Sequence, residues 1–374
     1  MGSLAIGSYL FHFHSLISIA IMFSAAVWLS ILSVASASHP PHPTAAPQYS
    51  GHSQNSWINY TAVPGFFLQD DAATTPSTFD YFEKYVDSLN KNASHNVNYK
   101  VLFMGRHGEG YHNAAETFYG TPACYYSILD GNATVTWADA HLDPAGISQA
   151  QKAAAYWASR LTLQKIPAPQ SYYTSPLYRC LQTSNITFST LSLPKSRPFK
   201  PTIKELFREG ISGHTCDRRS NKTFIHESFP TYKFEKGFVE TDPLWEALHG
   251  ETSGDQDIRS KKVLDEVFGS DDNTWLSITS HSGEIASILR VLHHRVFSLT
   301  TGAIIPVLVK AETIRSTPTS TSYLPCLKSD KCTFKANNWK VDDYFNMHES
   351  ASKHGDFLID RCEVMKDNIQ IIER

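Results

Sequence analysis

The stretch from Asn98 to Asn113 reads NYKVLFMGRHGEGYHN and changes character in its middle. Its first half, 98–105, is an apolar run of strand length that ends in glycine, which predicts a β-strand. From Arg106 onward most side chains are polar, and such residues are seldom found in a hydrophobic core. The stretch therefore predicts a buried strand that delivers a cluster of polar groups at its carboxyl end.

The rest of the chain alternates short apolar runs with segments of helical periodicity. Further strands are expected at 170–174, 274–279 and 305–310, and helices at 147–161, 176–189, 242–250, 255–268 and 283–295. Alternation of this kind predicts an α/β fold. We expect a three-layer α/β/α sandwich with a mostly parallel central sheet and helices on both faces.

Two other predicted strands also end in polar residues. Ser175-Pro176-Leu177-Tyr178-Arg179 follows the strand at 170–174, and Ser280-His281-Ser282-Gly283 follows the strand at 274–279. Ligands of open α/β sheets bind at the carboxyl ends of the strands, so these segments are expected to converge on one site. Two arginines and two histidines would meet there, and arginine forks match the oxygens of a phosphate group.

Arg106-His107-Gly108, followed by Asn113, resembles the motif of the histidine phosphatase superfamily, also called phosphoglycerate mutase-like. Further segments follow in that family's order: LDPAGISQA at 142–150, SPLYRCLQT at 175–183, LFRE at 206–209 and SHSG at 280–283. The resemblance extends over roughly residues 98–310. It is greatest to fungal phosphomutase-like members, on the strength of RHGEGYHN and of HTCDRR at 214–219.

The resemblance implies roles for the residues of this site. His107 is expected to attack phosphorus and to carry the phosphoryl group as phosphohistidine. Arg106, Arg179 and His281 are expected to bind the phosphoryl oxygens, with His281 counted among the catalytic residues, and Asn113 to donate a further hydrogen bond. These groups already supply the positive charge, so we expect neither a metal nor a cofactor.

The proton donor is expected to be Glu209, with Glu205 and Glu116 as alternatives. The acid-phosphatase and phytase branch of the family resembles RHGxRxP and places an aspartate after the second histidine. This chain has Glu109-Gly110-Tyr111 and Ser282 there, which speaks against a phytase and directs the acid role to Glu209. We interpret 217–219 (DRR) as a solvated loop, with a place at the pocket mouth as the alternative.

We expect the protein to be a secreted phosphatase that hydrolyses a phosphomonoester. The alternatives are a phosphoglycerate-type mutase and a phosphate-binding or interaction protein whose catalysis has lapsed. The formal net charge of −3, from 33 basic and 36 acidic residues, supplies no overall basic field for nucleic acid. The expected partner is therefore a small-molecule phosphate ester.

The first residues predict an exported protein. Residues 16–37 are uncharged and mostly apolar, and Ala35-Ser36-Ala37 fits a cleavage site. We predict a signal peptide at 1–37, a flexible leader at 38–56 and one phosphoglycerate mutase-like domain at 57–374. After cleavage no stable membrane association is expected, and an uncleaved signal-anchor is the alternative.

Glycosylation and disulfide bonds are expected in such a compartment. The N-x-S/T sequons begin at Asn59, Asn92, Asn132, Asn185 and Asn221. Cys326 and Cys332 bracket a short polar loop and form the predicted disulfide. For Cys124, Cys180, Cys216 and Cys362 the three possible pairings stay open, and buried thiols are the alternative.

Overall fold

A mixed sheet forms the centre of the molecule. The computed structural model describes residues 56–70, 74, 79–120, 126–247 and 249–315. Its seven-stranded sheet has the order β1-β7-β2-β6-β3-β4-β5. The strands are β1 (Ser56–Ala62), β2 (Val97–Arg106), β3 (Ser171–Thr174), β4 (Thr202–Ile203), β5 (Lys233–Phe234), β6 (Trp275–Ser280) and β7 (Ile304–Arg315).

Helices connect these strands and cover the sheet. They are α1 (Phe79–Asn92), α2 (Tyr111–Tyr119), α3 (Pro144–Ser159), α4 (Tyr178–Phe188), α5 (Lys222–Ser228), α6 (Ser253–Ser270) and α7 (Ser282–Val291). Short helical turns lie at η1 (Tyr126–Ile128), η2 (Arg160–Gln164), η3 (Glu205–Phe207) and η4 (Thr215–Asp217). Local sequence sets the helix starts: Asp143 caps α3 by accepting a hydrogen bond from Gly146 N at 2.7 Å, and Pro144 occupies its first turn.

Strand register brings the carboxyl ends of three strands level with one another. β2 pairs in parallel with β6, so that Arg106 lies opposite Ser280. β3 pairs in parallel with the other edge of β6, so that Thr174 lies opposite Thr279. Every residue of β6 is buried, as a central parallel strand covered on both faces requires. The polar residues that follow the three strands therefore start from one line across the sheet.

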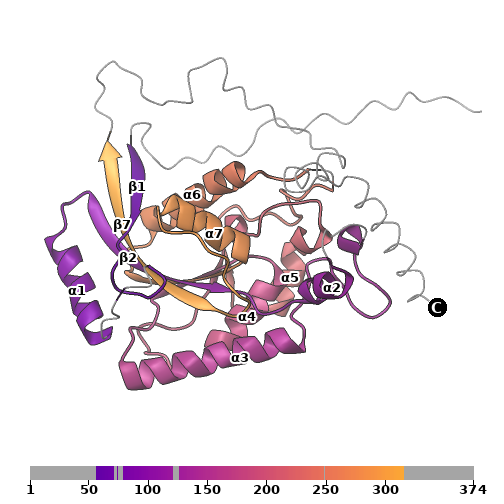
Figure 1. Cartoon of the computed structure of the whole chain (residues 1–374), viewed down its shortest axis with the longest axis horizontal. Helices are drawn as coiled ribbons and strands as arrows, with labels where there is room; N and C mark the ends of the chain where they lie inside the picture. Colours follow the sequence, from indigo (N-terminus) through magenta and orange to yellow (C-terminus); the bar gives the residue numbers. More distant parts are fainter. Residues whose placement is uncertain (1–55, 71–73, 75–78, 121–125, 248, 316–374) are drawn as a thin grey trace, which may run out of the picture. The chain divides into compact units, whose positions relative to one another are not determined.

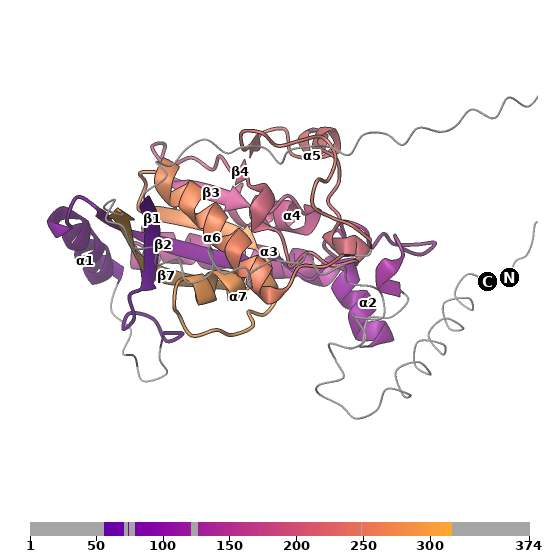
Figure 2. The same ribbon diagram turned by 90° about the horizontal axis from the view of Figure 1, so that it is seen from above.

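Two apolar cores lie on opposite faces of the sheet. One joins α6 and α7 to β2, β6, β7 and β1, through side chains such as Leu264, Ile285 and Leu276. The other joins α1, α3 and α4 to the sheet through Phe82, Trp157 and Phe188. In Figure 1, α6 and α7 lie on one side of the sheet and α3 on the other. Seen from above, α6 overlies the central strands (Figure 2). The predicted three-layer α/β/α sandwich is confirmed.

A segment of residues 110–142, which we call the α2 segment, lies between β2 and α3. Its two ends meet in an antiparallel bridge between Gly110 and Leu142, and Asp143 N donates to Glu109 O at 3.0 Å. Gly146 packs so tightly on the Glu109 backbone that a Cβ there would clash. The described part contains α2, η1 and a small aromatic core around Tyr126 and Trp137. Both views show α2 at the opposite end of the sheet from α1 (Figures 1 and 2).

The structure adds strand directions that the sequence prediction left open, and it corrects one predicted helix. The last strand, β7, runs antiparallel to β2, and β1 pairs antiparallel with β7. The predicted helix at 242–250 is wrong, because the described residues there form turns and bridges. The Asp242 carboxylate accepts hydrogen bonds from Leu244 N and Trp245 N, and it also binds Arg208. Those contacts hold a loop in place of a helical turn.

Some predictions concern residues outside the described ranges. The signal peptide at 1–37, the leader up to 55 and the cysteines Cys124, Cys326, Cys332 and Cys362 all lie there. Cys180 and Cys216 are described and both carry free thiols. No helix among the described residues is both long enough and apolar enough to span a bilayer.

Candidate active site

His107 lies at the end of β2 with its ring almost wholly buried, 2% exposed. Its backbone N–H donates to Ser280 O of β6 at 3.0 Å, which fixes the residue to the neighbouring strand. Nδ1 lies 2.6 Å from Gly108 O. A carbonyl oxygen can only accept, so Nδ1 carries the proton and the lone pair is on Nε2. The ring therefore presents its unprotonated nitrogen, Nε2, away from the backbone.

Arg179 faces that nitrogen from the first turn of α4. Its side chain is 1% exposed, and its Nε donates to His107 Nε2 at 3.3 Å. Nη1 donates to Cys216 O at 2.7 Å, and Nη2 lies 3.8 Å from a carboxylate oxygen of Asp217. The guanidinium is thus held on two sides and lies beside His107 Nε2. A phosphoryl group bound at Nε2 would lie against this fork.

His281 completes the central pair of rings. It is fully buried between β6 and α7, and its ring centroid lies 5.0 Å from that of His107 in an edge-on arrangement. Its Nε2 is 2.8 Å from Ser175 Oγ and 3.3 Å from Cys180 Sγ. These contacts come from the strand end and first helical turn that also carry Arg179. The strand ends predicted to converge from β2, β3 and β6 therefore do so.

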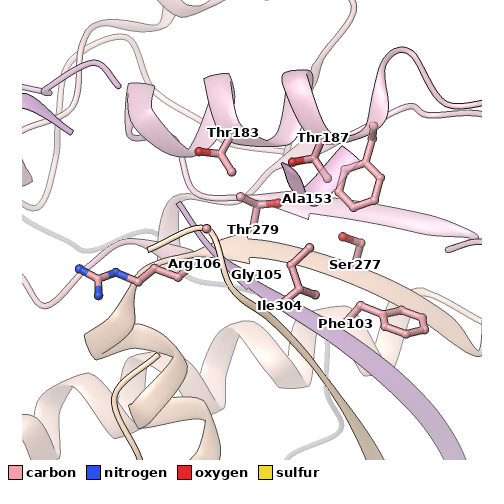
Figure 3. Close-up of a pocket in the computed structure, with 11 residues that line it drawn as sticks. Phe103, Gly105, Arg106, Ala153, Thr183, Thr187, Ser277, Thr279 and Ile304 are labelled. Atoms are coloured by element: carbon pink, nitrogen blue, oxygen red, sulfur yellow. The ribbon is translucent and has the colours of Figure 1, made fainter. Parts of the chain in front are cut away.

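Arg106 lies at the rim of this group. Its Nη1 donates to Leu299 O at 2.7 Å, while its buried Nε has no hydrogen-bond partner among the described residues. Figure 3 shows a void beneath the residue, lined by Thr183, Thr187 and other side chains, and the guanidinium points away from it. At about 10 Å³ this void has room for roughly one water and cannot be the substrate pocket. This Nε–H group can therefore donate a hydrogen bond to a bound anion.

The three candidate carboxylates have different surroundings. Glu209 Oε1 accepts from Gly210 N at 2.9 Å and from Glu284 N at 3.1 Å, and Oε2 accepts from Gly283 N at 3.3 Å. Its carboxylate thus lies at the N-terminus of α7, within electrostatic range of Arg179 and Arg106. Burial is the largest influence on it and raises the pKa of Glu209 above its usual value.

Glu205 lies in a separate ion-pair network, and Glu116 lies on α2 within electrostatic range of Arg106. Both Glu205 oxygens accept from Arg219 Nε at 2.9 Å, and Oε1 also accepts from Arg208 at 3.2 Å. That carboxylate belongs to a buried ion-pair network with Arg208 and Arg219. Glu116 is exposed on α2 and lines a separate cavity. Burial raises the pKa of Glu205 as well, so Glu209 is distinguished among the three by its proximity to both Arg106 and Arg179.

Burial also governs the histidines. It lowers the pKa of His107, His281 and the neighbouring His112 well below the usual 6.5, and the Arg179 charge adds to the effect. The His112 ring lies 5.7 Å from that of His107. All three rings are therefore held in the neutral form that a nitrogen nucleophile requires.

Asn113 is not brought against His107 by any hydrogen bond of the described residues. Its Oδ1 accepts from Gly110 N at 3.1 Å, so that the side chain caps the first turn of α2. Its predicted contact with phosphate stays a prediction. His107, Arg106, Arg179, His281 and Glu209, in contrast, form one cluster.

Several members of the site had no predicted role. Ser175 and Cys180 contact His281, and Thr183 Oγ1 accepts from Gly108 N at 3.0 Å. All three belong to the SPLYRCLQT segment at 175–183, so their place directly after a strand was the available signal. The solvated loop predicted at 217–219 is wrong for Asp217 and Arg219, which are 5% and 4% exposed.

One group of described residues has the donor atoms of a metal site. A nitrogen of His214, the Cys216 sulfur and a carboxylate oxygen of Asp217 lie within 4.8 Å of one another. Asp217, however, already accepts from Ser212 Oγ at 2.6 Å and lies beside Arg179. Its position is thereby explained as the counter-charge of the site arginine.

Comparison with known proteins agrees with this geometry. The sequence model of the histidine phosphatase superfamily (branch 1) matches residues 129–301, which include Arg179, Glu209 and His281 and begin after His107. A "Probable phosphoglycerate mutase" of Arthroderma benhamiae is 49% identical over 292 residues, covering 70% of this chain and 87% of the relative. "Phosphomutase-like protein 3" of Candida albicans is 37% identical, covering 58% and 67%.

Solved structures with similar folds are more distant in sequence. The mycobacterial glucosyl-3-phosphoglycerate phosphatase has a TM-score of 0.35 at 18% identity, covering 55% of this chain and 90% of that one. The phosphoserine phosphatase of Entamoeba histolytica has a TM-score of 0.33 at 18% identity, covering 55% and 89%. The family follows from the Arthroderma relative and the matched sequence model: this chain belongs to the histidine phosphatase superfamily (branch 1).

Proposed function

We propose that this protein is a phosphatase that hydrolyses phosphomonoesters through a phosphohistidine on His107. The observation that carries the proposal is the orientation of the His107 ring. Its proton is held on Nδ1 by Gly108 O, and its Nε2 lone pair lies 3.3 Å from Arg179 Nε. An ester phosphate that binds Arg179 through its oxygens would take over this hydrogen bond and leave the Nε2 lone pair free to attack phosphorus.

Two chemical steps follow from this arrangement. In the first, Nε2 of His107 forms a bond to phosphorus while the ester oxygen leaves and takes a proton from Glu209. In the second, Glu209 accepts a proton from water, whose oxygen attacks phosphorus and releases His107 and inorganic phosphate. The arginines and His281 stabilise the charge on the phosphoryl oxygens throughout. The raised pKa of Glu209 favours its acid form relative to an ordinary glutamate, which suits the role of proton donor.

Turnover of p-nitrophenyl phosphate in the presence of EDTA tests the proposal. We expect hydrolysis in the wild-type protein and none in His107→Ala, with His293→Asn as a control that removes an exposed histidine. An acid-labile, alkali-stable phosphoryl group on the quenched wild-type protein would identify the intermediate. No turnover of any ester, with phosphate binding retained, would contradict a phosphatase and favour the lapsed binding protein.

A mutase is the second candidate, because two relatives carry that name. A mutase must return the phosphoryl group to an organic hydroxyl and hold a second anionic group while it does so. Interconversion of 2- and 3-phosphoglycerate without release of inorganic phosphate would support the mutase. Release of phosphate as the product would support the hydrolase.

We also propose that the protein is secreted and glycosylated. Among the sequons, Asn59, Asn92 and Asn221 are exposed, whereas Asn132 and Asn185 are half-buried. We therefore expect glycans at the first three positions. Glycosylation is tested by the mass of the secreted protein before and after enzymatic deglycosylation. Signal cleavage is tested by the N-terminal residue, which we expect to be Ser38. Peptide mapping without reduction tests for a Cys326–Cys332 bond. An unchanged mass would contradict glycosylation.

A further inference from the structure

A cavity of about 90 Å³ lies next to the catalytic cluster, between the α2 segment and η4. It is lined by His112, Glu116, Tyr126, Ser127, Trp137, His214, Thr215 and Cys216. Two of these residues connect it to the chemistry. The His112 ring lies 5.7 Å from the His107 ring, and the Cys216 carbonyl accepts from the Arg179 guanidinium. A group bound to a phosphoryl on His107 would therefore extend toward this cavity.

The walls of the cavity are held in place before any ligand arrives. Tyr126 and Trp137 are 4% and 3% exposed, and their rings pack edge to face with centroids 5.9 Å apart. Thr215 Oγ1 donates to Leu129 O at 2.6 Å, and Trp245 Nε1 donates to His214 O at 2.8 Å. η4 is thus fixed both to the α2 segment and to the loop after β5. A pocket that is formed in advance selects its ligand by shape and charge.

The charge of the lining is one-sided. Glu116 is its single acidic side chain, and none of the described residues that line it is lysine or arginine. His112 contributes no positive charge, because burial and the Arg179 charge lower its pKa well below 6.5. A second anionic group of a substrate would meet the Glu116 carboxylate, and none of the described lining residues is a lysine or arginine that could pair with it. A hydroxyl group would meet acceptors and donors, including the buried His112 Nδ1, which has no partner among the described residues.

We infer that this cavity binds the alcohol portion of the substrate, and that the substrate is a monoester of a small, uncharged alcohol bearing hydroxyl groups. The inference rests on the proposed function and specifies its substrate class. Glu116 is the specificity-determining residue: its carboxylate accepts hydrogen bonds from hydroxyls and repels a carboxylate or a second phosphate on the leaving group. The volume has room for several waters, and so for a group of a few carbon and oxygen atoms.

Two matched esters test this directly. Glycerol 3-phosphate and 3-phosphoglycerate differ only in carrying a hydroxymethyl or a carboxylate group at the far end. We expect the wild-type protein to favour glycerol 3-phosphate in kcat/KM by on the order of tenfold. Glu116→Gln should remove most of that preference, and Glu116→Lys should reverse it. Glu227→Lys makes the same charge change at an exposed glutamate on α5 outside the cavity and should keep the wild-type preference.

Binding supplies a readout that needs no turnover. In a His107→Ala background, calorimetry of the same two esters should show the same order of affinities and the same reversal by Glu116→Lys. Equal affinities with and without that substitution would overturn the inference, whatever the activity. A retained reversal in a protein that hydrolyses no ester would uphold the pocket and overturn the proposed phosphatase instead. A reversal caused equally by Glu227→Lys would assign the effect to overall charge and overturn the pocket.

Discussion

Acidification should destabilise this fold through three histidines of the site: His107 and His281, which are buried, and His112, which is half-buried. The pKa of His107, His112 and His281 lies well below 6.5 in the folded protein, chiefly because of burial and then of Arg179. In the unfolded chain each histidine titrates near 6.5. Below that pH the unfolded state binds more protons, so the free energy of unfolding falls as pH falls.

The size of the effect follows from linkage. When the pH falls from 6.5 to about 5.5, each histidine that stays neutral in the folded state lowers the free energy of unfolding by about 1 kcal/mol. The three together therefore lower it by about 3 kcal/mol. Carboxyls with a raised pKa, such as Glu284 with a pKa of about 7, act in the opposite direction over this range. A comparison with a single variant cancels them. His281→Asn removes one titrating ring and should reduce the pH-dependent loss by about 1 kcal/mol.

Urea unfolding at the two pH values measures this difference. The control is His293→Asn, which changes an exposed histidine and keeps all three rings of the site, so it should retain their full loss. Wild type and His281→Asn showing the same change in unfolding free energy between the two pH values would refute the reasoning. That result would mean that the His281 ring takes up a proton in the folded state as readily as in the unfolded state.

Three further predictions concern the same site. Arg179→Lys should lower kcat/KM for p-nitrophenyl phosphate by about a hundredfold, because a lysine cannot form both the Nε contact with His107 and a fork on the phosphate; near wild-type kinetics would contradict that role. Gly283→Ala places a Cβ against the Glu209 carboxylate, so kcat should fall by about tenfold or more for an alkyl phosphate and much less for p-nitrophenyl phosphate, whose leaving group needs little protonation; equal losses on both esters would argue against Glu209 as the acid. Burial raises the pKa of Glu284 to about 7, so its contribution makes the folded state less stable as pH rises from about 4.5 to 7, by about 3 kcal/mol in total. Denaturant titrations of Glu284→Gln should show that dependence removed, and an unaltered pH profile would count against it.

The strand ends of the site could be predicted from sequence because the change in polarity there is abrupt. The apolar run predicted at 98–105 corresponds to β2 (Val97–Arg106), and the run at 274–279 to β6 (Trp275–Ser280). A buried strand needs an unbroken apolar run, so the polar residues that follow it mark the strand's end. Parallel pairing then brought His107, Arg179 and His281 together without any knowledge of loop structure.

Other features depend on partners that are distant in the sequence. The direction of β7 was not predictable, because the apolar pattern of a strand is the same read in either direction. Which carboxylate can act as the proton donor depends on its hydrogen-bond partners. Arg219 donates to Glu205, whereas Glu209 accepts from the backbone at the N-terminus of α7. Likewise, 242–250 has the composition of a helix, and the contact of Asp242 with Arg208 overrides that local preference.

The two ends of the α2 segment are joined to each other, so that changes within the segment need not disturb the strand that carries His107. The ends are joined by the Gly110–Leu142 bridge and by the packing of Gly146 on Glu109. The entropic cost of a longer loop grows only with the logarithm of its length, so insertions within the segment cost little and leave β2 unmoved. The segment that carries the proposed alcohol pocket could therefore change in length without moving His107. An engineer could exchange the segment between relatives as a cassette, with Gly110 and Leu142 as the junctions.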